Sequence, residues 1–166
     1  MTRPQRIEPG PGQESVWDYP RPPAIEPTSS LVRVEHGGRT VAETTRAVRI
    51  LETSQPPGFY LPPDDVDLTL LVESASATGC EWKGTASYFD LVVPGVPRVT
   101  DAAWSYRSPT PRFAAIAGHI AFYPQRVDAC FVDDERVESN EGSFYGGWIT
   151  SNVVGPFKGG PGSWGW

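Results

Sequence analysis

The stretch LVRVEHGGRTVAE, residues 31–43, indicates the fold class more directly than any other part of this sequence. Val32 and Val34 alternate with charged residues, which is the two-residue period of a strand that is buried on one face. Gly37 and Gly38 come next, and glycine readily adopts the positive φ angles that primed two-residue turns require. The residues after the turn again have the character of a strand, so the stretch predicts a β-hairpin.

Turn-forming residues separate similar short runs along the rest of the chain. The 17 glycines and 18 prolines among 166 residues fall mostly between apolar segments, and both residue types are unfavourable inside helices. Roughly seven to nine short strands in a chain of this length predict one mainly β domain with a barrel-like or folded-sheet core. Beyond the hairpin, strands are expected over residues 46–53, 59–61, 66–73, 85–93, 98–106, 119–123 and 126–132, and a helical turn over residues 112–117.

The two ends of the chain differ from its middle. Residues 1–28 form a proline-rich arm, in which Trp17 and Tyr19 are suited to docking on a core. Residues 138–166 form a tail rich in glycine and in aromatic residues, which ordinary flexible linkers lack. We therefore expect three parts: the arm, a β domain over residues 29–137, and a tail that packs on that domain or on a neighbouring subunit.

The charge pattern weighs against nucleic-acid binding. Acidic residues number 20 against 14 basic ones, giving a net charge of −6, whereas a nucleic-acid surface needs clustered Lys and Arg. Residues 62–81 carry five acidic residues and no basic one, which indicates a solvated edge or, alternatively, an acidic binding surface. No apolar run is long enough to span a membrane, and residues 1–12 lack the apolar core of a signal peptide, so we expect a cytoplasmic protein without a membrane partner.

The cysteine and histidine residues predict neither a disulfide nor a metal site. Cys80 and Cys130 are expected to remain thiols in a reducing compartment, and neither they nor His36 and His119 have the spacing of zinc ligands. We therefore expect no metal and no cofactor. Cys80 is interpreted as a small buried apolar residue rather than a nucleophile, and His119 as a structural residue rather than a catalyst. The glycine-rich residues 155–162, GPFKGGPG, lack the order of a phosphate-binding loop.

Five blocks of sequence, in their order and spacing, resemble a known family. They read AVRILET, PGFYLPPDD, CEWKGTASY, AWSY and IAGHIAFY, and they begin at residues 47, 57, 80, 103 and 116. The stretch from about residue 31 to residue 137 is similar to the bacterial and fungal domain of unknown function 427 (DUF427), and the arm and tail resemble extensions of actinobacterial members. Glu81 and Trp82 stand where the family pattern has Pro-Tyr, a change that keeps an aromatic residue.

The resemblance implies a small, open β-barrel of the β-tent kind, similar to zinc-binding folds. Because this chain lacks the paired cysteines of those relatives, core packing must stabilise the fold without zinc. The family has also been filed under a nucleotidyltransferase label. Such enzymes hold magnesium with two alternating acidic residues after a Gly-Ser turn. The Gly-Ser pairs of this chain, at residues 142–143 and 162–163, both follow Asp65 and Asp67, so the sequence does not support that label.

Glu52 is the most informative candidate for chemistry. In its expected strand it shares a face with Val48 and Ile50, which places its carboxylate at the inner edge of that face. A buried carboxylate needs a partner. Glu52 therefore either pairs with Arg49, Lys83 or a tyrosine hydroxyl in a structural role, or it binds a ligand or transfers a proton. The sequence leaves both interpretations open.

A second group of candidates is suited to forming a cavity around Glu52. Lys83 precedes Gly84 at the start of a strand, and it either points over a pocket mouth or lies in an exposed turn. The aromatic residues of nearby strands either fill the core or line a cavity for a flat or sugar-like ligand. Our first hypothesis is a small-molecule-binding domain; whether it is an enzyme is left open, with Glu52 and Lys83 as catalytic candidates. The candidate ligand-binding residues are Glu52, Tyr60, Lys83, Tyr88, Trp104 and Tyr106.

The second hypothesis is a protein-interaction module that uses the acidic residues 62–81 and the tail. A concave aromatic cluster around Glu52 favours the first hypothesis, whereas a flat aromatic patch formed by the tail favours the second. A third alternative is nucleotidyl transfer, which rests only on the label of the family that the sequence resembles. The expected partner is an unidentified small molecule, and homo-oligomerisation is left open.

Overall fold

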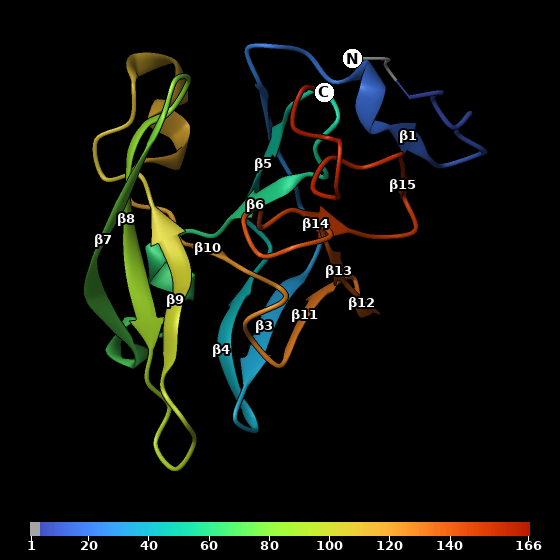
Figure 1. The fold of residues 1–166 in the computed structure, drawn as a ribbon. Helices are drawn as coiled ribbons and strands as arrows, with labels where there is room; N and C mark the ends of the chain where they lie inside the picture. The colour runs from blue at the N-terminus through green and yellow to red at the C-terminus, as the bar shows by residue number, and fades with distance from the viewer. Residues whose placement is uncertain (1–3) are drawn as a thin grey trace.

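Short strands dominate the structure, a computed structural model that describes residues 4–166 (Figure 1). Strands account for 40% of the residues and helices for 9%. The expectation of a single small, mainly β domain is confirmed, but the strands form several separate sheets rather than a closed barrel. The 3-10 helices are η1 (Val16–Asp18), η2 (Pro63–Asp65), η3 (Leu68–Leu70) and η4 (Pro111–Ile116). No helix in the described part of the chain is long and apolar enough to cross a membrane.

The hairpin predicted from residues 31–43 is present. Strands β3 (Val32–His36) and β4 (Arg39–Thr44) are joined by Gly37 and Gly38, whose φ angles are 59° and 75°. Both valines of the predicted inner face are fully buried, because that face packs against the main core. The sheet has the order β12-β11-β3-β4, with β11 at Ala129–Val132 and β12 at Glu135–Arg136.

A second four-stranded sheet forms a separate layer, on the left in Figure 1. Its order is β10 (Ala121–Phe122), β9 (Val99–Ser105), β8 (Gly84–Leu91) and β7 (Leu71–Cys80). The strand expected over residues 66–73 is displaced, because η3 occupies its first half and β7 then pairs with β8 as far as Cys80. The Asp67 carboxylate caps η3 by accepting a hydrogen bond from the Thr69 amide at 3.2 Å.

A third sheet of three strands links the other two. It has the order β2-β5-β6, with β2 at Ala24–Pro27, β5 at Val48–Leu51 and β6 at Gly58–Tyr60. Leu61 and Ile120 exchange two backbone hydrogen bonds of 2.8 Å, which join the end of β6 to the start of β10. A buried cluster combines side chains of β5, β6 and β8. Because β5 is shorter than the strand expected over residues 46–53, Glu52 follows its end, at the edge of this junction.

The N-terminal arm lies against the C-terminal tail. Their strands β1 (Glu14–Ser15) and β15 (Val153–Val154) pair in parallel. Trp17 is 9% exposed, and its indole Nε1 donates to the Pro156 carbonyl at 2.9 Å. The arm also supplies β2, so both ends of the chain help to build the structure around β5.

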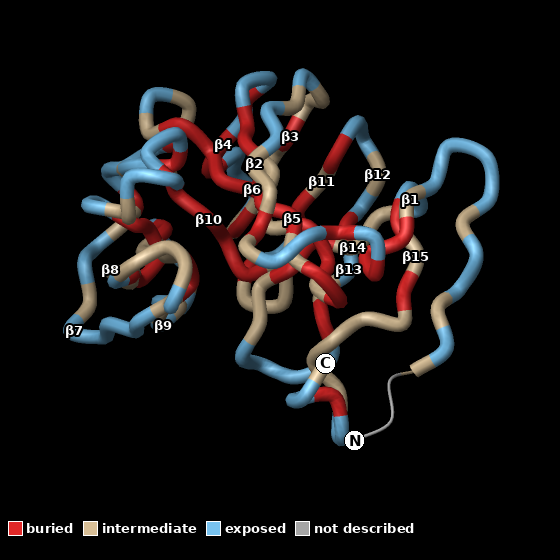
Figure 2. Tube along the Cα trace, turned by 90° about the horizontal axis from the view of Figure 1, so that it is seen from above, coloured by how far each residue is buried: buried red, intermediate tan, exposed pale blue. Residues whose placement is uncertain are grey.

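One aromatic residue anchors the tail in the main core. Strand β14 (Trp148–Ile149) pairs with β13 (Glu138–Ser139) and carries Trp148, which is 1% exposed. The Trp148 indole Nε1 donates to the Phe122 carbonyl at 3.0 Å, and its ring stacks on Phe59 with centroids 4.9 Å apart. Figure 2 shows buried residues concentrated where the tail meets the central sheets, whereas the β7 edge is exposed.

Candidate functional site

A cavity of about 750 Å³ is lined by residues of strands β5 to β9 and the turns beside them and by two parts of the tail, residues 143–147 and Lys158. Its volume lies within the range of small-molecule pockets, about 300–1,000 Å³. The strands bring together all of the candidate residues that the sequence singled out. The cavity is lined by Glu52, Tyr60, Lys83, Tyr88, Trp104 and Tyr106.

Aromatic side chains form the floor of this cavity. The Trp104 indole Nε1 donates to the Tyr60 hydroxyl at 3.2 Å, and the two rings meet edge to face with centroids 6.1 Å apart. The Tyr106 ring lies 6.2 Å from the Tyr60 ring, and the Tyr88 hydroxyl lies 2.8 Å from the Thr78 hydroxyl. Burial raises the pKa of both Tyr60 and Tyr106 above the ordinary value. These phenols are therefore neutral at physiological pH and act on a ligand as hydrogen-bonding groups on flat apolar rings.

Lys83 extends from the β7–β8 turn over this floor. Its Nζ lies 5.6 Å from the centroid of the Tyr106 ring, so it is not the exposed turn lysine of the alternative interpretation. Burial acts to lower the pKa of Lys83, but Tyr60, Cys80 and Glu52 act in the opposite direction, and the net pKa is raised. The group is thus an ammonium at neutral pH. It makes no ion pair within 4 Å with any residue between 4 and 166, but the Glu52 carboxylate attracts it from a longer distance and the Cys80 side chain forms a hydrogen bond with it.

Glu52 lies at the edge of the cavity with a partner that the sequence did not indicate. Its carboxylate is 3.6 Å from the guanidinium of Arg21, and its side chain is 22% exposed. Arg21 belongs to the arm and is held by further hydrogen bonds to the Thr53 carbonyl at 2.9 Å and the Trp166 carbonyl at 2.7 Å. The arm therefore orients the carboxylate at the cavity edge.

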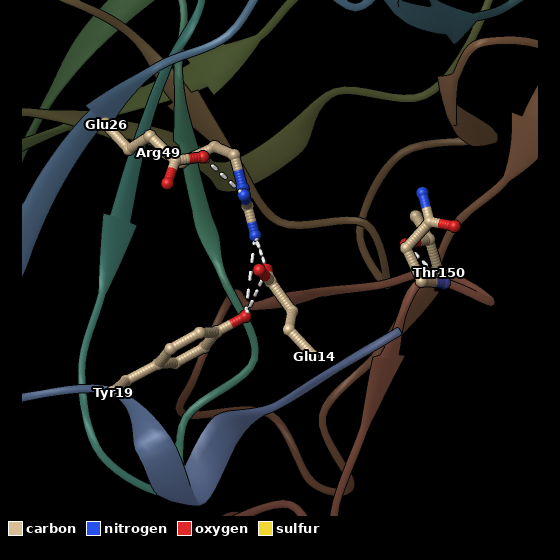
Figure 3. Close-up of polar contacts among 6 residues, drawn as sticks. Glu14, Tyr19, Glu26, Arg49 and Thr150 are labelled. Atoms are coloured by element: carbon tan, nitrogen blue, oxygen red, sulfur yellow. Dashed lines mark hydrogen bonds and ion pairs between the residues drawn. The ribbon is translucent and has the colours of Figure 1, made fainter. Parts of the chain in front are cut away.

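Arg49 was one expected partner of Glu52, and that expectation is wrong. Successive residues of a strand point to opposite faces, so Arg49 projects away from the cavity-facing side of β5. Figure 3 shows Arg49 with Glu14 and Glu26 of the arm and with the Tyr19 hydroxyl. Arg49 Nη1 donates to Glu26 at 2.6 Å, and Tyr19 donates to Glu14 at 2.6 Å. This network fastens the arm to β5 and leaves the cavity to other residues.

The family model described as Domain of unknown function (DUF427) matches residues 24–133, which is more than half of the chain. The chain belongs to the DUF427 family. The resemblance seen in the sequence is therefore confirmed, although the model's label, NTP_transf_9, is a name and identifies no site. No curated protein matches the chain. Within residues 4–166 there is no group of three or more His, Cys, Asp or Glu placed to hold a metal ion.

The DUF427 domain and the tail contribute different parts of the cavity. All six candidate residues lie within the matched residues 24–133, whereas the wall formed by residues 143–147 and by Lys158 lies beyond them. At Gly146 the tail touches the floor so closely that a Cβ atom would stand 2.6 Å from the Trp104 ring and 2.9 Å from the Tyr123 ring. Only glycine allows this approach, and the sequence alone did not indicate where the tail would lie.

Two polar residues hold this wall in place: Arg126 joins it to the DUF427 domain, and Asn140 joins two parts of the tail to each other. Arg126 lies over the Tyr123 ring at 3.9 Å and donates to the carbonyls of Asp101 at 2.6 Å and Ser143 at 2.7 Å. Asn140 is 2% exposed and binds the tail twice. Its Oδ1 accepts from the Gly147 amide at 2.8 Å, and its Nδ2 donates to the Lys158 carbonyl at 2.5 Å.

The remaining titratable candidates separate into lining and structural residues. Cys80 is a partly exposed free thiol that lines the cavity, so its expected burial as an apolar residue is incomplete. Cys130 is a buried free thiol whose pKa is raised by burial. His119 does not line the cavity, and its Nδ1 lies 3.3 Å from the Ala117 carbonyl. Of the residues that the sequence singled out, the cavity therefore contains Lys83, Glu52, Cys80 and the tyrosine hydroxyls.

Proposed function

We propose that this DUF427 chain binds a small molecule that carries a ring and an anionic group. One observation carries the proposal: the Lys83 ammonium stands over an aromatic floor and has no carboxylate of residues 4–166 within 4 Å. A partly desolvated cation is stabilised by an anion that comes close to it. The ring of the ligand would lie on Trp104 and the tyrosines, and its anionic group would meet Lys83.

The aromatic floor favours a flat or sugar-like ring. Offset and edge-to-face contacts between rings add to the free energy of apolar burial. The phenol and indole groups exchange hydrogen bonds with hydroxyl groups of a ligand. Glu52, oriented by Arg21, would accept a hydrogen bond from the ligand at the cavity edge, and it remains the candidate for any proton transfer.

The rival hypothesis of a protein-interaction module has less support from the geometry. The aromatic residues around Glu52 form a concave cluster, which is the arrangement that favours a small-molecule site. In the tail, the rings of Phe144, Tyr145 and Trp164 form an exposed aromatic cluster, with Phe144 64% and Trp164 58% exposed, and two of its three members, Phe144 and Tyr145, also line the cavity.

A thermal-shift screen of the purified protein against a metabolite collection tests the proposal, because a ligand that binds only the folded state raises the melting temperature. We expect the compounds that raise it to be ring-bearing anions. Hits composed only of cations or of acyclic molecules would contradict the proposal.

Glu52→Gln separates a ligand-binding role from a structural one. Its pair with Arg21 is partly exposed, so we expect the substitution to lower the free energy of unfolding by no more than about 1 kcal/mol. The response to a hit from the screen should change clearly, because the charge at the cavity edge is lost. Melting curves of wild type and variant, with and without the hit, give both quantities. A large loss of stability with an unchanged ligand response would assign Glu52 a structural role only.

A further inference from the structure

The chain has few lysines, and both of them line the cavity described above. The sequence contains 14 basic residues, of which only Lys83 and Lys158 are lysines. Both line the same cavity. Lysine carries a compact ammonium on a flexible stem, and it is suited to point contact with an anion. The only two residues of this type are thus concentrated at the candidate site.

Lys158 is held in place by its backbone. Its amide donates to the Ser54 carbonyl at 2.9 Å, and its carbonyl accepts from Asn140 at 2.5 Å. Its Nζ lies 5.6 Å from the centroid of the Tyr145 ring, and Tyr145 lines the cavity as well. The side chain is partly buried along this ring. Lys158 therefore presents its charge from the tail, over a different ring from the one beneath Lys83.

Neither ammonium has a carboxylate within 4 Å among residues 4–166. Three acidic residues also line the cavity, but two of them are already engaged. Glu52 pairs with Arg21, and Asp101 accepts hydrogen bonds from Ser74 at 2.6 Å and Ser76 at 2.7 Å. The third, Glu81, is exposed on the β7–β8 turn. The charges of the cavity wall that have no ion-pair partner among the described residues are therefore three positive ones, Lys83, Lys158 and Arg126, and two negative ones, Asp101 and Glu81.

We infer that the ligand carries two separate anionic groups on one ring scaffold, one for Lys83 and one for Lys158. The inference rests on the proposed function and specifies its ligand class: carboxylates or phosphates at two positions of a ring-bearing molecule. Lys83 lies within residues 24–133, whereas Lys158 lies in the tail. The DUF427 domain thus supplies the floor and one anion contact, and the tail adds the second contact and selects dianions.

Matched pairs of aromatic acids test this inference. The probes are benzoate against terephthalate, 2-naphthoate against 2,6-naphthalenedicarboxylate, and 4-biphenylcarboxylate against 4,4′-biphenyldicarboxylate, which vary the distance between two carboxylates. Titration calorimetry at low ionic strength gives the affinity ratio within each pair. In the wild type we expect at least one dicarboxylate to bind roughly tenfold tighter than its monocarboxylate, because it gains a second charge-assisted contact.

Two variants assign the second contact. In Lys158→Met the affinity ratio of dicarboxylate to monocarboxylate should fall to about one for the pair that shows the preference in the wild type. Arg39→Met is the control, because it removes a positive charge from the β3–β4 hairpin outside the cavity. In this variant the affinity ratio should stay as in the wild type. Ratios near one in the wild type, together with monocarboxylate binding that depends on Lys83, would overturn the inference and leave the proposed function standing. A ratio that persists in Lys158→Met would also overturn the inference. Failure of every mono- and dicarboxylate to bind, together with a metabolite screen that yields no ring-bearing anion, would overturn the proposed function itself.

Discussion

Trp148→Ala is expected to lower the free energy of unfolding by about 3–5 kcal/mol, the cost of truncating a buried tryptophan. The side chain is 1% exposed and stacks on Phe59 in the main core. Its truncation also leaves the Phe122 carbonyl without the indole donor at 3.0 Å. Because Trp148 lies outside residues 24–133, this result would show that the tail stabilises the DUF427 domain.

Urea denaturation of the wild type and the variant measures this effect. Trp164→Ala is the matched control, since Trp164 belongs to the same tail but is 58% exposed, and its truncation should change stability by no more than about 0.5 kcal/mol. Equal losses in the two variants, or a loss below about 1 kcal/mol for Trp148→Ala, would show that the tail does not depend on this anchor.

Lys83→Met is expected to weaken binding of a ring-bearing anion by roughly ten- to hundredfold, because the ligand loses a hydrogen bond to a charged, partly desolvated group. The fold should tolerate the change. The substitution breaks no ion pair at contact distance, since Glu52 attracts Lys83 only from beyond 4 Å, and methionine keeps most of the apolar stem over the Tyr106 ring. Stability should therefore be unchanged or slightly higher while affinity falls.

Calorimetric titration and melting curves on the same preparations separate the two effects. Arg39→Met is again the control for the loss of one positive charge outside the cavity, and it should leave affinity near the wild-type value. A variant that binds as well as the wild type, or that loses affinity only in proportion to a loss of folded protein, would contradict the assignment of Lys83.

The parts of the fold that follow from local pattern could be predicted from the sequence. The alternation of valines before Gly37 and Gly38 determines the β3–β4 hairpin because a strand period and a turn signal coincide within a few residues. The second half of β7 could not be predicted in this way. Its residues 74–79 are small or polar and mostly exposed, so no buried face imposes a period on them.

The same distinction applies to the site. The residues of the floor lie on strands whose inward faces alternate, and for that reason Tyr60, Trp104 and Tyr106 could be grouped before the structure was known. The contributions of Arg21 and Lys158 depend on where the arm and the tail dock. Docking of that kind is a tertiary contact between residues far apart in the chain, and glycine- and proline-rich segments carry no periodic pattern that would indicate it.

The central claim is that a ring-bearing anion binds at Lys83. Amine labelling tests it most directly, because the sequence has only two lysine side chains that can react, in addition to the amino-terminal amine. The native protein is acetylated under limiting reagent, with and without a saturating concentration of the tightest-binding aromatic acid, and each amine is followed by mass spectrometry. We predict that the acid slows acetylation of Lys83 at least several-fold and leaves the amino terminus unaffected. Equal acetylation of Lys83 with and without a compound that still raises the melting temperature would place the binding site elsewhere and contradict the claim.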